Sequence, residues 1–189
     1  VGAFLAALQD DPTYAGQIVH MHTEPAKPAR FADLPAGLGA LPRAFLSRLG
    51  IAHLYSHQAE AIDALLQGKD VLLTAGAAGG KSLCYQLPIL DALSEDPNST
   101  ALLVFPSKAL ARDQLVAWQR GLDDDSPDAA ARPRLAAPYD ADAGRADRRA
   151  ARDEAHVVVT NPEMLHVQML PDHGRWARFF AHLRFVVLD

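Results

Sequence analysis

Short runs of apolar residues alternate along the chain with longer segments in which apolar positions recur every three or four residues. Runs that are apolar at nearly every position predict strands buried on both faces, as in a parallel sheet covered by helices. These runs are residues 71–74, 101–105, 157–160 and 185–188. Helical periodicity predicts helices over residues 81–93, 108–121, 143–155 and 163–170. The alternation of strands and helices predicts a doubly wound α/β fold, mostly a parallel sheet with helices on both faces.

Two prolines restrict this pattern. Pro88 lies inside the first of these helices, where it should kink the helix or end it early. Pro138 limits a weaker predicted strand over residues 135–139 to a sheet edge or a strand end.

The first forty residues differ in character from the rest. Phe4, Leu5 and Leu8 share one face of a short predicted helix, residues 18–22 predict a strand, and an extended segment punctuated by prolines follows. We therefore expect residues 1–40 to form an N-terminal accessory arm that packs on a core domain of residues 41–189.

Composition narrows the class of protein. The chain has 189 residues, 49% of them hydrophobic, which is enough to bury the core of one domain. A formal net charge of -5 argues against a histone-like nucleic-acid binder but is compatible with a focal DNA or RNA groove. The single cysteine, Cys84, leaves no internal disulfide and no cysteine zinc cluster, so a reducing, cytoplasmic location is the default expectation.

The sequence predicts no membrane contact. No apolar run approaches the roughly 20 residues needed to cross a bilayer, and the N-terminus lacks the basic then apolar order of a signal peptide. The chain begins at Val1 and ends at Asp189 directly after an apolar run, so we expect both ends to be internal to a longer protein.

Candidate chemistry is concentrated where the first predicted strand of the sheet meets its helix. The loop over residues 75–80 consists of alanine and glycine, and Lys81 and Ser82 follow it. Small residues let backbone N–H groups close around phosphate oxygens, while the lysine adds positive charge and the serine hydroxyl can ligate Mg²⁺. The sequence therefore predicts a nucleotide phosphate site, although Ala75 stands where the usual pattern has its first glycine. The alternative is a flexible linker before a surface lysine.

Two residues distant in sequence complete the predicted nucleotide site. The side-chain amide of Gln58 can bond both N6 and N7 of adenine, which would select ATP over GTP. The alternative for Gln58 is a polar helix start that Ser56 caps. Asp189 follows an apolar strand, as expected of a carboxylate that holds Mg²⁺ beside a nucleotide. ATP and Mg²⁺ are the predicted cofactors.

Two turns between a strand and a helix predict a track for nucleic acid. Ser107 and Lys108 follow one predicted strand, and Thr160 and Asn161 lie at the end of another. The helix start in each turn offers backbone N–H groups and a dipole that attract a phosphate. Because the carboxyl ends of parallel strands meet at one sheet edge, we expect the two turns to lie side by side.

Five motifs in this order resemble those of superfamily 2 helicases, specifically the first RecA-like domain of a DEAD/DEAH-box enzyme. The similarity runs from about Ile18 onward and is greatest to the MrfA-type (mitomycin repair) bacterial and fungal DNA helicases, which carry a C-terminal cysteine-cluster domain. The motifs are residues 54–62 (Q motif), 75–88 (motif I), 106–114 (motif Ia), 160–165 (motif Ib) and 186–189 (the start of motif II).

The resemblance implies a RecA-like P-loop NTPase domain that serves as the ATP-binding motor of an ATP-dependent DNA helicase or translocase in DNA repair. It implies catalytic roles for Lys81 and Asp189 and Mg²⁺ coordination by Ser82 and Asp189. The implied nucleotide-binding residues are Tyr55, Gln58, Ala77, Ala78, Gly79, Gly80, Lys81 and Ser82. The implied nucleic-acid-binding residues are Pro106, Ser107, Lys108, Arg112, Thr160 and Asn161.

The resemblance also implies partners: single-stranded or partly duplex DNA, and a second RecA-like domain in the same natural chain. Motif II requires a glutamate directly after Asp189, and arginine fingers come from the second domain. We therefore expect the 189-residue segment by itself to bind ATP without turning it over at a useful rate.

Several residues depart from the family pattern. Ala77 and Gly79 replace hydroxyl residues in the phosphate loop, which would loosen the loop or weaken nucleotide affinity. Residues 141–143 stand in place of a Gly-Asp-Thr element that grips the DNA backbone, and Ser107 replaces a threonine. These departures bear on the predicted binding of the DNA backbone more than on the predicted fold.

Other classes of function stay open. An RNA helicase or remodelling translocase would use the same first domain, and the 2′-OH contacts that separate RNA from DNA are not visible in the sequence. The altered loop also fits a non-catalytic nucleotide-binding scaffold. A small-molecule P-loop kinase is disfavoured because its base-binding and lid elements would have to replace the turns at Pro106 and Thr160.

Two further clusters have a structural and a functional interpretation. Arginines at three- and four-residue spacing predict one helix face, on which a salt-bridged solvent surface is favoured over a nucleic-acid contact; they are Arg145, Arg148, Arg149 and Arg152. Trp176, Phe179 and Phe180 have helical spacing, which favours core packing over base stacking.

Overall fold

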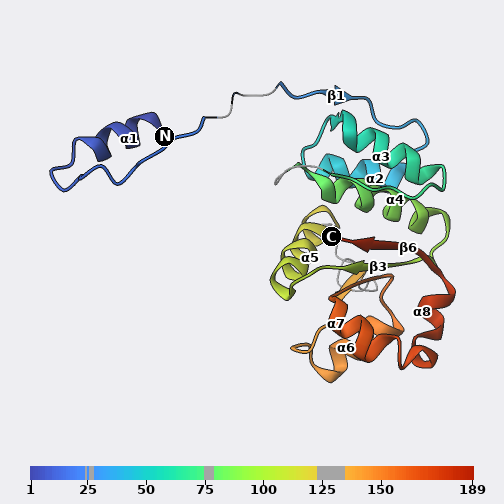
Figure 1. Cartoon of the computed structure of the whole chain (residues 1–189). Helices are drawn as coiled ribbons and strands as arrows, with labels where there is room; N and C mark the ends of the chain where they lie inside the picture. Colours follow the sequence, from blue (N-terminus) through green and yellow to red (C-terminus); the bar gives the residue numbers. More distant parts are fainter. Residues whose placement is uncertain (24, 26–27, 75–78, 123–134) are drawn as a thin grey trace.

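The computed structural model of the chain describes all residues except 24, 26–27, 75–78 and 123–134 (Figure 1). Its main sheet has four parallel strands in the order β4-β5-β3-β6. The strands are β3 (Thr100–Val104), β4 (Ala136–Pro138), β5 (Val157–Thr160) and β6 (Leu183–Leu188). A separate antiparallel pair joins β1 (Phe31–Ala32) to β2 (Leu54–Tyr55). The predicted mostly parallel sheet is confirmed.

Helices cover both faces of this sheet. The helices of the described residues are, in chain order, α1 (Gly2–Gln9), α2 (Ala40–Arg48), α3 (Ser56–Leu66), α4 (Lys81–Glu95), α5 (Lys108–Leu122), α6 (Arg145–Asp153), α7 (Pro162–Met164), the π-helix η2 (Leu165–Met169), the 3₁₀-helix η3 (His173–Trp176) and α8 (Ala177–Ala181), of which α1 does not contribute to covering the sheet. In Figure 1, α2, α3 and α4 lie on one side of the sheet, and α6, α7 and α8 lie on the other.

The sheet separates two hydrophobic cores. Successive side chains of a strand point to opposite faces, so Leu103 of β3 packs with Phe45 and Trp118. Its neighbour Leu102 packs in the second core, with Trp176 and Phe179. A strand such as β3, buried at all five positions, belongs to a sheet covered on both sides, and the predicted doubly wound fold is confirmed.

The prediction of a strand at residues 71–74 is wrong. These residues have no regular secondary structure, and Leu72 is 93% exposed. An apolar run becomes a strand only where a neighbouring strand pairs with its backbone, and β6, at the end of the described sheet, pairs only with β3. The expectation that β6 is buried on both faces is also wrong, because Val186 and Leu188 are 56% and 77% exposed.

The two prolines act differently. Helix α4 continues through Pro88 to Glu95, so the expected early end does not occur. Pro88 and the five residues that follow it, up to Leu93, are buried, and this packing offsets the missing backbone hydrogen bond. Pro138 ends β4 at the sheet edge, as predicted.

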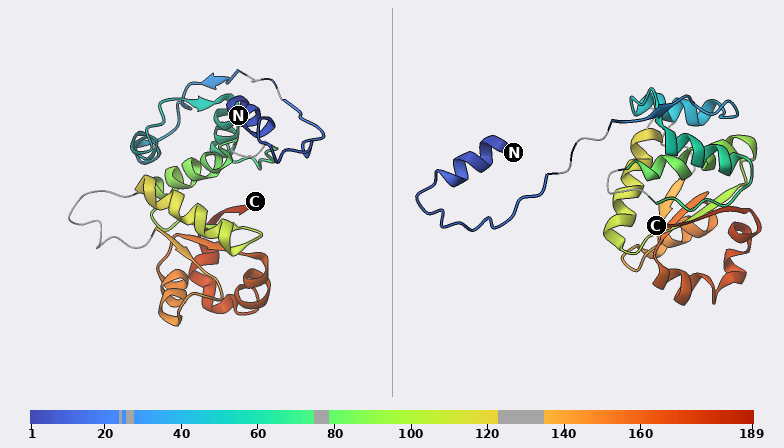
Figure 2. Two further views of the ribbon diagram at one scale, coloured as in Figure 1. Left: turned by 90° about the vertical axis from the view of Figure 1, so that its left-hand side faces the viewer. Right: turned by 45° about the horizontal axis from the view of Figure 1, so that its top comes forward.

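The N-terminal arm packs on the core only in part. Phe31 and Ala32 pair with β2, and Leu38 is buried. The predicted helix at the N-terminus is present as α1, but it buries no residue and lies apart from the rest of the chain (Figure 2). The strand predicted over residues 18–22 is absent, because these residues have no regular structure.

Candidate nucleotide and nucleic-acid sites

The start of α4 has the backbone geometry of an anion site. Gly80 is the N-cap and adopts a left-handed conformation with φ of 69°, and Lys81 and Ser82 form the first turn. At the start of this 15-residue helix the backbone N–H groups point along the axis toward the loop, and the helix dipole adds a partial positive charge. Ala77 and Ala78, which the sequence predicts to bind nucleotide, lie outside the described residues, whereas Gly79 lies within them.

Helix α3 fixes the end of the phosphate loop. The Gln58 amide nitrogen donates to the Gly80 carbonyl at 2.8 Å, and the His57 ring nitrogen Nε2 lies 2.9 Å from the Gly79 carbonyl. The Gln58 side-chain oxygen accepts from the backbone N–H of Tyr55 at 2.8 Å. Gln58 is buried, and both the oxygen and the nitrogen of its amide are hydrogen-bonded. The adenine contact stays a prediction, and it would require exchange of these bonds.

The helix-start interpretation of Gln58 therefore holds in this structure, with one change. The side chain that satisfies the Tyr55 N–H belongs to Gln58 itself rather than to Ser56. The contact of His57 with the loop was not predicted, and its one sequence signal is a second polar side chain at the start of α3.

Stacked aromatic rings lie beside Gln58. Tyr55 stacks on Phe31 at 5.3 Å between ring centroids and on His57 at 5.7 Å. Phe31 and Tyr55 are 61% and 39% exposed, so they offer a surface against which a base can stack. The sequence predicts Tyr55 but misses Phe31, which lies in the arm and reaches Tyr55 only through the β1–β2 pair.

The Ser82 hydroxyl connects α4 to α5. It donates to the Gln114 side-chain oxygen at 2.8 Å, and the Tyr85 hydroxyl donates to the same oxygen at 2.9 Å. Burial raises the pKa of Tyr85 to about 12, and the negative charge of Asp189 contributes to the same direction. Tyr85 therefore stays a neutral donor in the physiological range.

Asp189 lies at the carboxyl end of β6, where its backbone N–H donates to the Val104 carbonyl at 3.1 Å. A serine hydroxyl and a carboxylate are oxygen ligands of the kind that Mg²⁺ prefers, with substrate phosphates and water completing its shell. Within the part of the chain that the structure describes, no three His, Cys, Asp or Glu residues cluster as a metal site. Ser82 and Asp189 thus fit Mg²⁺ held jointly with a nucleotide.

The turn after β3 is joined to the loop after β4. Lys108 and Arg112 form ion pairs with Asp142 at 3.0 and 3.1 Å. The hydrogen bond from Lys108 lowers the pKa of Asp142, and the nearby charges add to that effect. Ser107 accepts from the Leu110 N–H at 3.3 Å and caps α5, while Pro106 is exposed. The basic side chains predicted to bind nucleic acid therefore share a carboxylate.

Thr160 and Asn161 are turned inward. The Thr160 hydroxyl donates to the Tyr139 carbonyl at 2.8 Å, and the Asn161 side-chain oxygen accepts from the Met164 N–H at 3.0 Å. Both residues are buried. Each side chain satisfies a backbone group at the turn, so a side-chain contact with a bound strand would require exchange of these bonds. A role of the two residues in binding nucleic acid stays a prediction.

The two predicted turns lie side by side. The Phe105 N–H donates to the Thr160 carbonyl at 2.9 Å, so the ends of β3 and β5 meet at one edge, and Asp189 follows β6 at the same edge.

Trp176 and Phe179 are buried in the second core and Phe180 packs against it, which confirms the core interpretation. No helix in the described ranges is both long enough and apolar enough to cross a membrane.

The sequence of the chain is similar to those of known helicases. Residues 55–189 match the family described as DEAD/DEAH box helicase. The ATP-dependent helicase HRQ1 of Saccharomyces cerevisiae is 39% identical over 184 residues, which cover 96% of this chain and 16% of the relative. The uncharacterized ATP-dependent helicase YprA of Bacillus subtilis is 34% identical over 172 residues, covering 91% of this chain and 22% of the relative.

A solved structure extends the match to three dimensions. The crystal structure of the DUF1998 helicase MrfA bound to DNA and AMPPNP superposes with a TM-score of 0.83 and 31% identity, covering 100% of this chain and 25% of that one. The chain spans about a sixth to a quarter of the length of these proteins.

Proposed function

The chain belongs to the DEAD/DEAH box helicase family, and we propose on this premise that it is the ATP-binding motor domain of an ATP-dependent DNA helicase or translocase that acts in DNA repair. One observation carries the proposal. The start of α4, Gln58 of α3 and Asp189 lie at one side of the sheet, next to the turns after β3 and β5. A nucleotide and a nucleic-acid strand would thus bind within reach of one sheet edge.

The residues suit ATP with Mg²⁺. Lys81 and the N–H groups at the start of α4 would bind the phosphates, and Gln58 would exchange its present bonds for the adenine edge. Ser82 and Asp189 would hold Mg²⁺, which when bound neutralises charge on the phosphate oxygens. The Ser82 hydroxyl would then turn from Gln114 toward the metal.

DNA is the proposed polymer, supported by similarity to MrfA, which has been solved with DNA. The proposed second partner is another RecA-like domain in the same natural chain, which would supply arginine fingers and close on the DNA strand in each ATP cycle. We also propose a reducing, cytoplasmic location, supported by Cys84, a buried free thiol that is the sole cysteine of the sequence.

ATP turnover by the longest natural chain that contains these residues tests the proposal. We expect single-stranded DNA to stimulate turnover, single-stranded RNA to stimulate it less, and Lys81→Ala to abolish the stimulated rate. Lys69→Ala removes an exposed lysine outside the site and serves as the matched control, which should retain full turnover.

Each other outcome selects an alternative. Stronger stimulation by RNA than by DNA would favour the RNA helicase. No turnover with any polymer, combined with retained binding of a nucleotide analogue, would replace the motor by a nucleotide-binding scaffold.

A further inference from the structure

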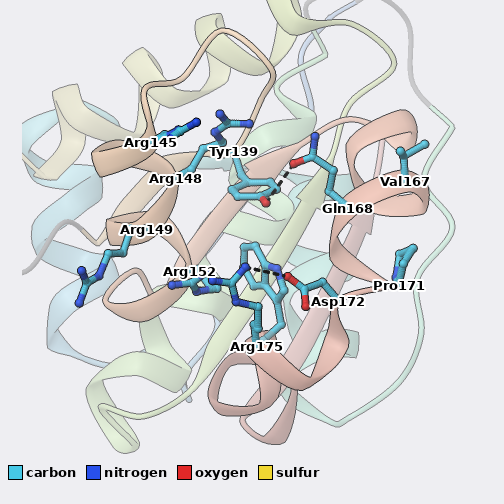
Figure 3. A pocket seen from close by; sticks show the side chains of 11 residues that line it. Tyr139, Arg145, Arg148, Arg149, Arg152, Val167, Gln168, Pro171, Asp172 and Arg175 are labelled. Carbon is cyan, nitrogen blue, oxygen red and sulfur yellow. Dashed lines mark hydrogen bonds and ion pairs between the residues drawn. The ribbon is translucent and has the colours of Figure 1, made fainter.

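A basic pocket of about 770 Å³ lies between α6 and the turn that connects η2 to η3. Five arginines line it: Arg145, Arg148, Arg149, Arg152 and Arg175. In Figure 3 the four arginines of α6 form one wall, Gln168 and Asp172 stand opposite, and Tyr139 lies between the walls. The concentration of positive charge is notable because the whole chain carries a formal charge of -5.

The arginines outnumber the carboxylates that pair with them. Arg149 and Arg152 share Asp153, at 3.4 and 2.7 Å, and Arg175 pairs with Asp172 at 3.3 Å. Arg145 and Arg148 have no salt bridge to any residue in the described ranges. The salt-bridged solvent face expected from the sequence therefore accounts for only half of the arginines on α6. An arginine keeps its charge at all physiological pH values, so the excess positive charge is permanent.

The pocket adjoins the proposed nucleic-acid edge. Tyr139 lines the pocket through its ring, and its carbonyl accepts the hydrogen bond of Thr160 in the turn after β5. Helix α6 begins at Arg145, three residues after Asp142, which pairs with Lys108 in the turn after β3. A nucleic acid that lies along the edge and continues past β4 would reach the α6 arginines.

The spacing of the arginines suits a sugar-phosphate backbone. A helix rises 1.5 Å per residue, so Arg145 and Arg152 are about 10 Å apart along the axis of α6. Phosphates of one strand of a duplex are about 3.4 Å apart along the duplex axis, so this face spans about three of them. Guanidinium groups bind phosphates in a bidentate manner, without reading the sequence. The pocket aromatics are not available for base stacking, because Trp176 is buried and meets Tyr139 edge to face at 4.8 Å.

From this geometry we propose that the arginine pocket binds the phosphate backbone of the duplex that flanks the single strand on the sheet edge. The inference rests on the proposed function, because the edge must carry DNA for the pocket to receive its continuation. It adds a duplex contact, independent of sequence, to the single-strand contacts made by the turns after β3 and β5.

The test compares the longest natural chain with its Arg145→Gln/Arg148→Gln variant, in which both charges are lost and side chains of similar length remain. Binding to a DNA with a duplex and a single-stranded tail, and to the tail alone, is measured over a range of salt concentrations. We expect the slope of log K against log salt for the tailed duplex to fall by about 2 in magnitude, since each lost phosphate contact removes about 0.9. Affinity for the tail alone should be unchanged.

Two control variants separate charge from structure. Arg145→Lys/Arg148→Lys keeps both charges and should retain most of the salt slope, which a purely structural role of the arginines does not predict. Lys69→Ala/Arg120→Ala removes two exposed charges outside the pocket and should leave the slope unchanged.

The inference is overturned if the glutamine pair keeps the slope of the unchanged protein, or if the unchanged protein does not bind the tailed duplex. It is also overturned if the glutamine pair loses binding of polyglutamate but not of DNA, because the pocket would then fit an acidic polypeptide. Failure of the proposed function is a different result, namely absent DNA-stimulated ATP turnover in the unchanged protein.

Discussion

At the scale of single residues, Gly80 is where backbone conformation and site geometry coincide. Its φ of 69° is a conformation that other residues adopt at a cost, and a Cβ atom there would run into the Gln58 amide nitrogen. The Gly80 carbonyl is also the acceptor of the Gln58 amide. The position therefore requires glycine for two independent reasons.

Gly80→Ala should lower the free energy of unfolding by about 2–4 kcal/mol. Of this, about 1–2 kcal/mol comes from the left-handed backbone, and the rest comes from a displaced, buried Gln58 amide. Denaturant unfolding measures the loss, and titration with a nucleotide analogue should show weaker binding.

Gly68→Ala is the matched control for this prediction, because Gly68 has a φ of 74° and nothing within 4 Å of an added Cβ. The Gly68→Ala variant should lose only the about 1–2 kcal/mol of unfolding free energy that comes from the left-handed backbone, and its nucleotide affinity should be unchanged. Equal losses of stability and affinity in the two variants would refute the role assigned to Gln58.

The motif order predicted where the candidate residues lie in the fold better than it predicted the partners of their side chains. Lys81 and Ser82 lie at the start of α4 and Asp189 at the carboxyl end of β6, as the motif order implies, and their roles stay predictions. The motif order did not foresee that Gln58 and Thr160 would bond to backbone carbonyls, because such bonds depend on which carbonyl the fold places nearby. Side-chain type reveals the capacity to bond, whereas tertiary structure selects the partner.

At the scale of elements, the contact between α2 and α5 depends on a small residue. Gly121 lies in the last turn of α5, and a Cβ added there would run into the Phe45 ring of α2. Phe45 is fully buried and packs on Trp118 of α5 at 6.2 Å between ring centroids. The two helices can therefore approach this closely only because position 121 has no side chain.

Gly121→Ala should lower the free energy of unfolding by about 1–3 kcal/mol, because the methyl group overpacks a core that has no room to relax. Gly174→Ala, in η3, is the matched control: nothing lies within 4 Å of its added Cβ, and stability should not fall. Chemical denaturation of both variants is the measurement, and an unaffected Gly121→Ala protein would contradict the packing described.

Elements with strong periodicity on buried surfaces were predicted well. Strand β5 matches its predicted range, and α4 and α5 start at the predicted residues. Residues 71–74 were predicted wrongly, because their composition is that of a strand but strand formation depends on a partner elsewhere in the chain. Helix α2 was not predicted, because Pro42 and the preceding prolines suggested an extended segment.

At the scale of the whole molecule, α5 connects the two proposed binding sites. Gln114 of α5 accepts from Ser82, which would turn to Mg²⁺ when nucleotide binds. The same helix begins at Lys108, in the turn proposed to meet nucleic acid. Nucleotide binding would therefore remove one of the hydrogen bonds that hold α5 against α4, which provides a physical route by which ATP and DNA influence each other's binding.

Gln114→Leu removes the acceptor while keeping a side chain of similar size, so Ser82 has no bond to break when it turns to the metal. In the longest natural chain, DNA affinity measured with and without a nucleotide analogue gives the coupling between the two sites. We expect coupling of about 5-fold or more in the unchanged protein and a value close to 1 in the variant. Tyr85→Phe is the matched control, because it removes the other hydrogen bond to Gln114 and leaves the bond from Ser82 in place. Coupling that survives in Gln114→Leu would show that neither hydrogen bond to Gln114 carries it, and coupling that disappears in both variants would show that the bond from Tyr85 is also required.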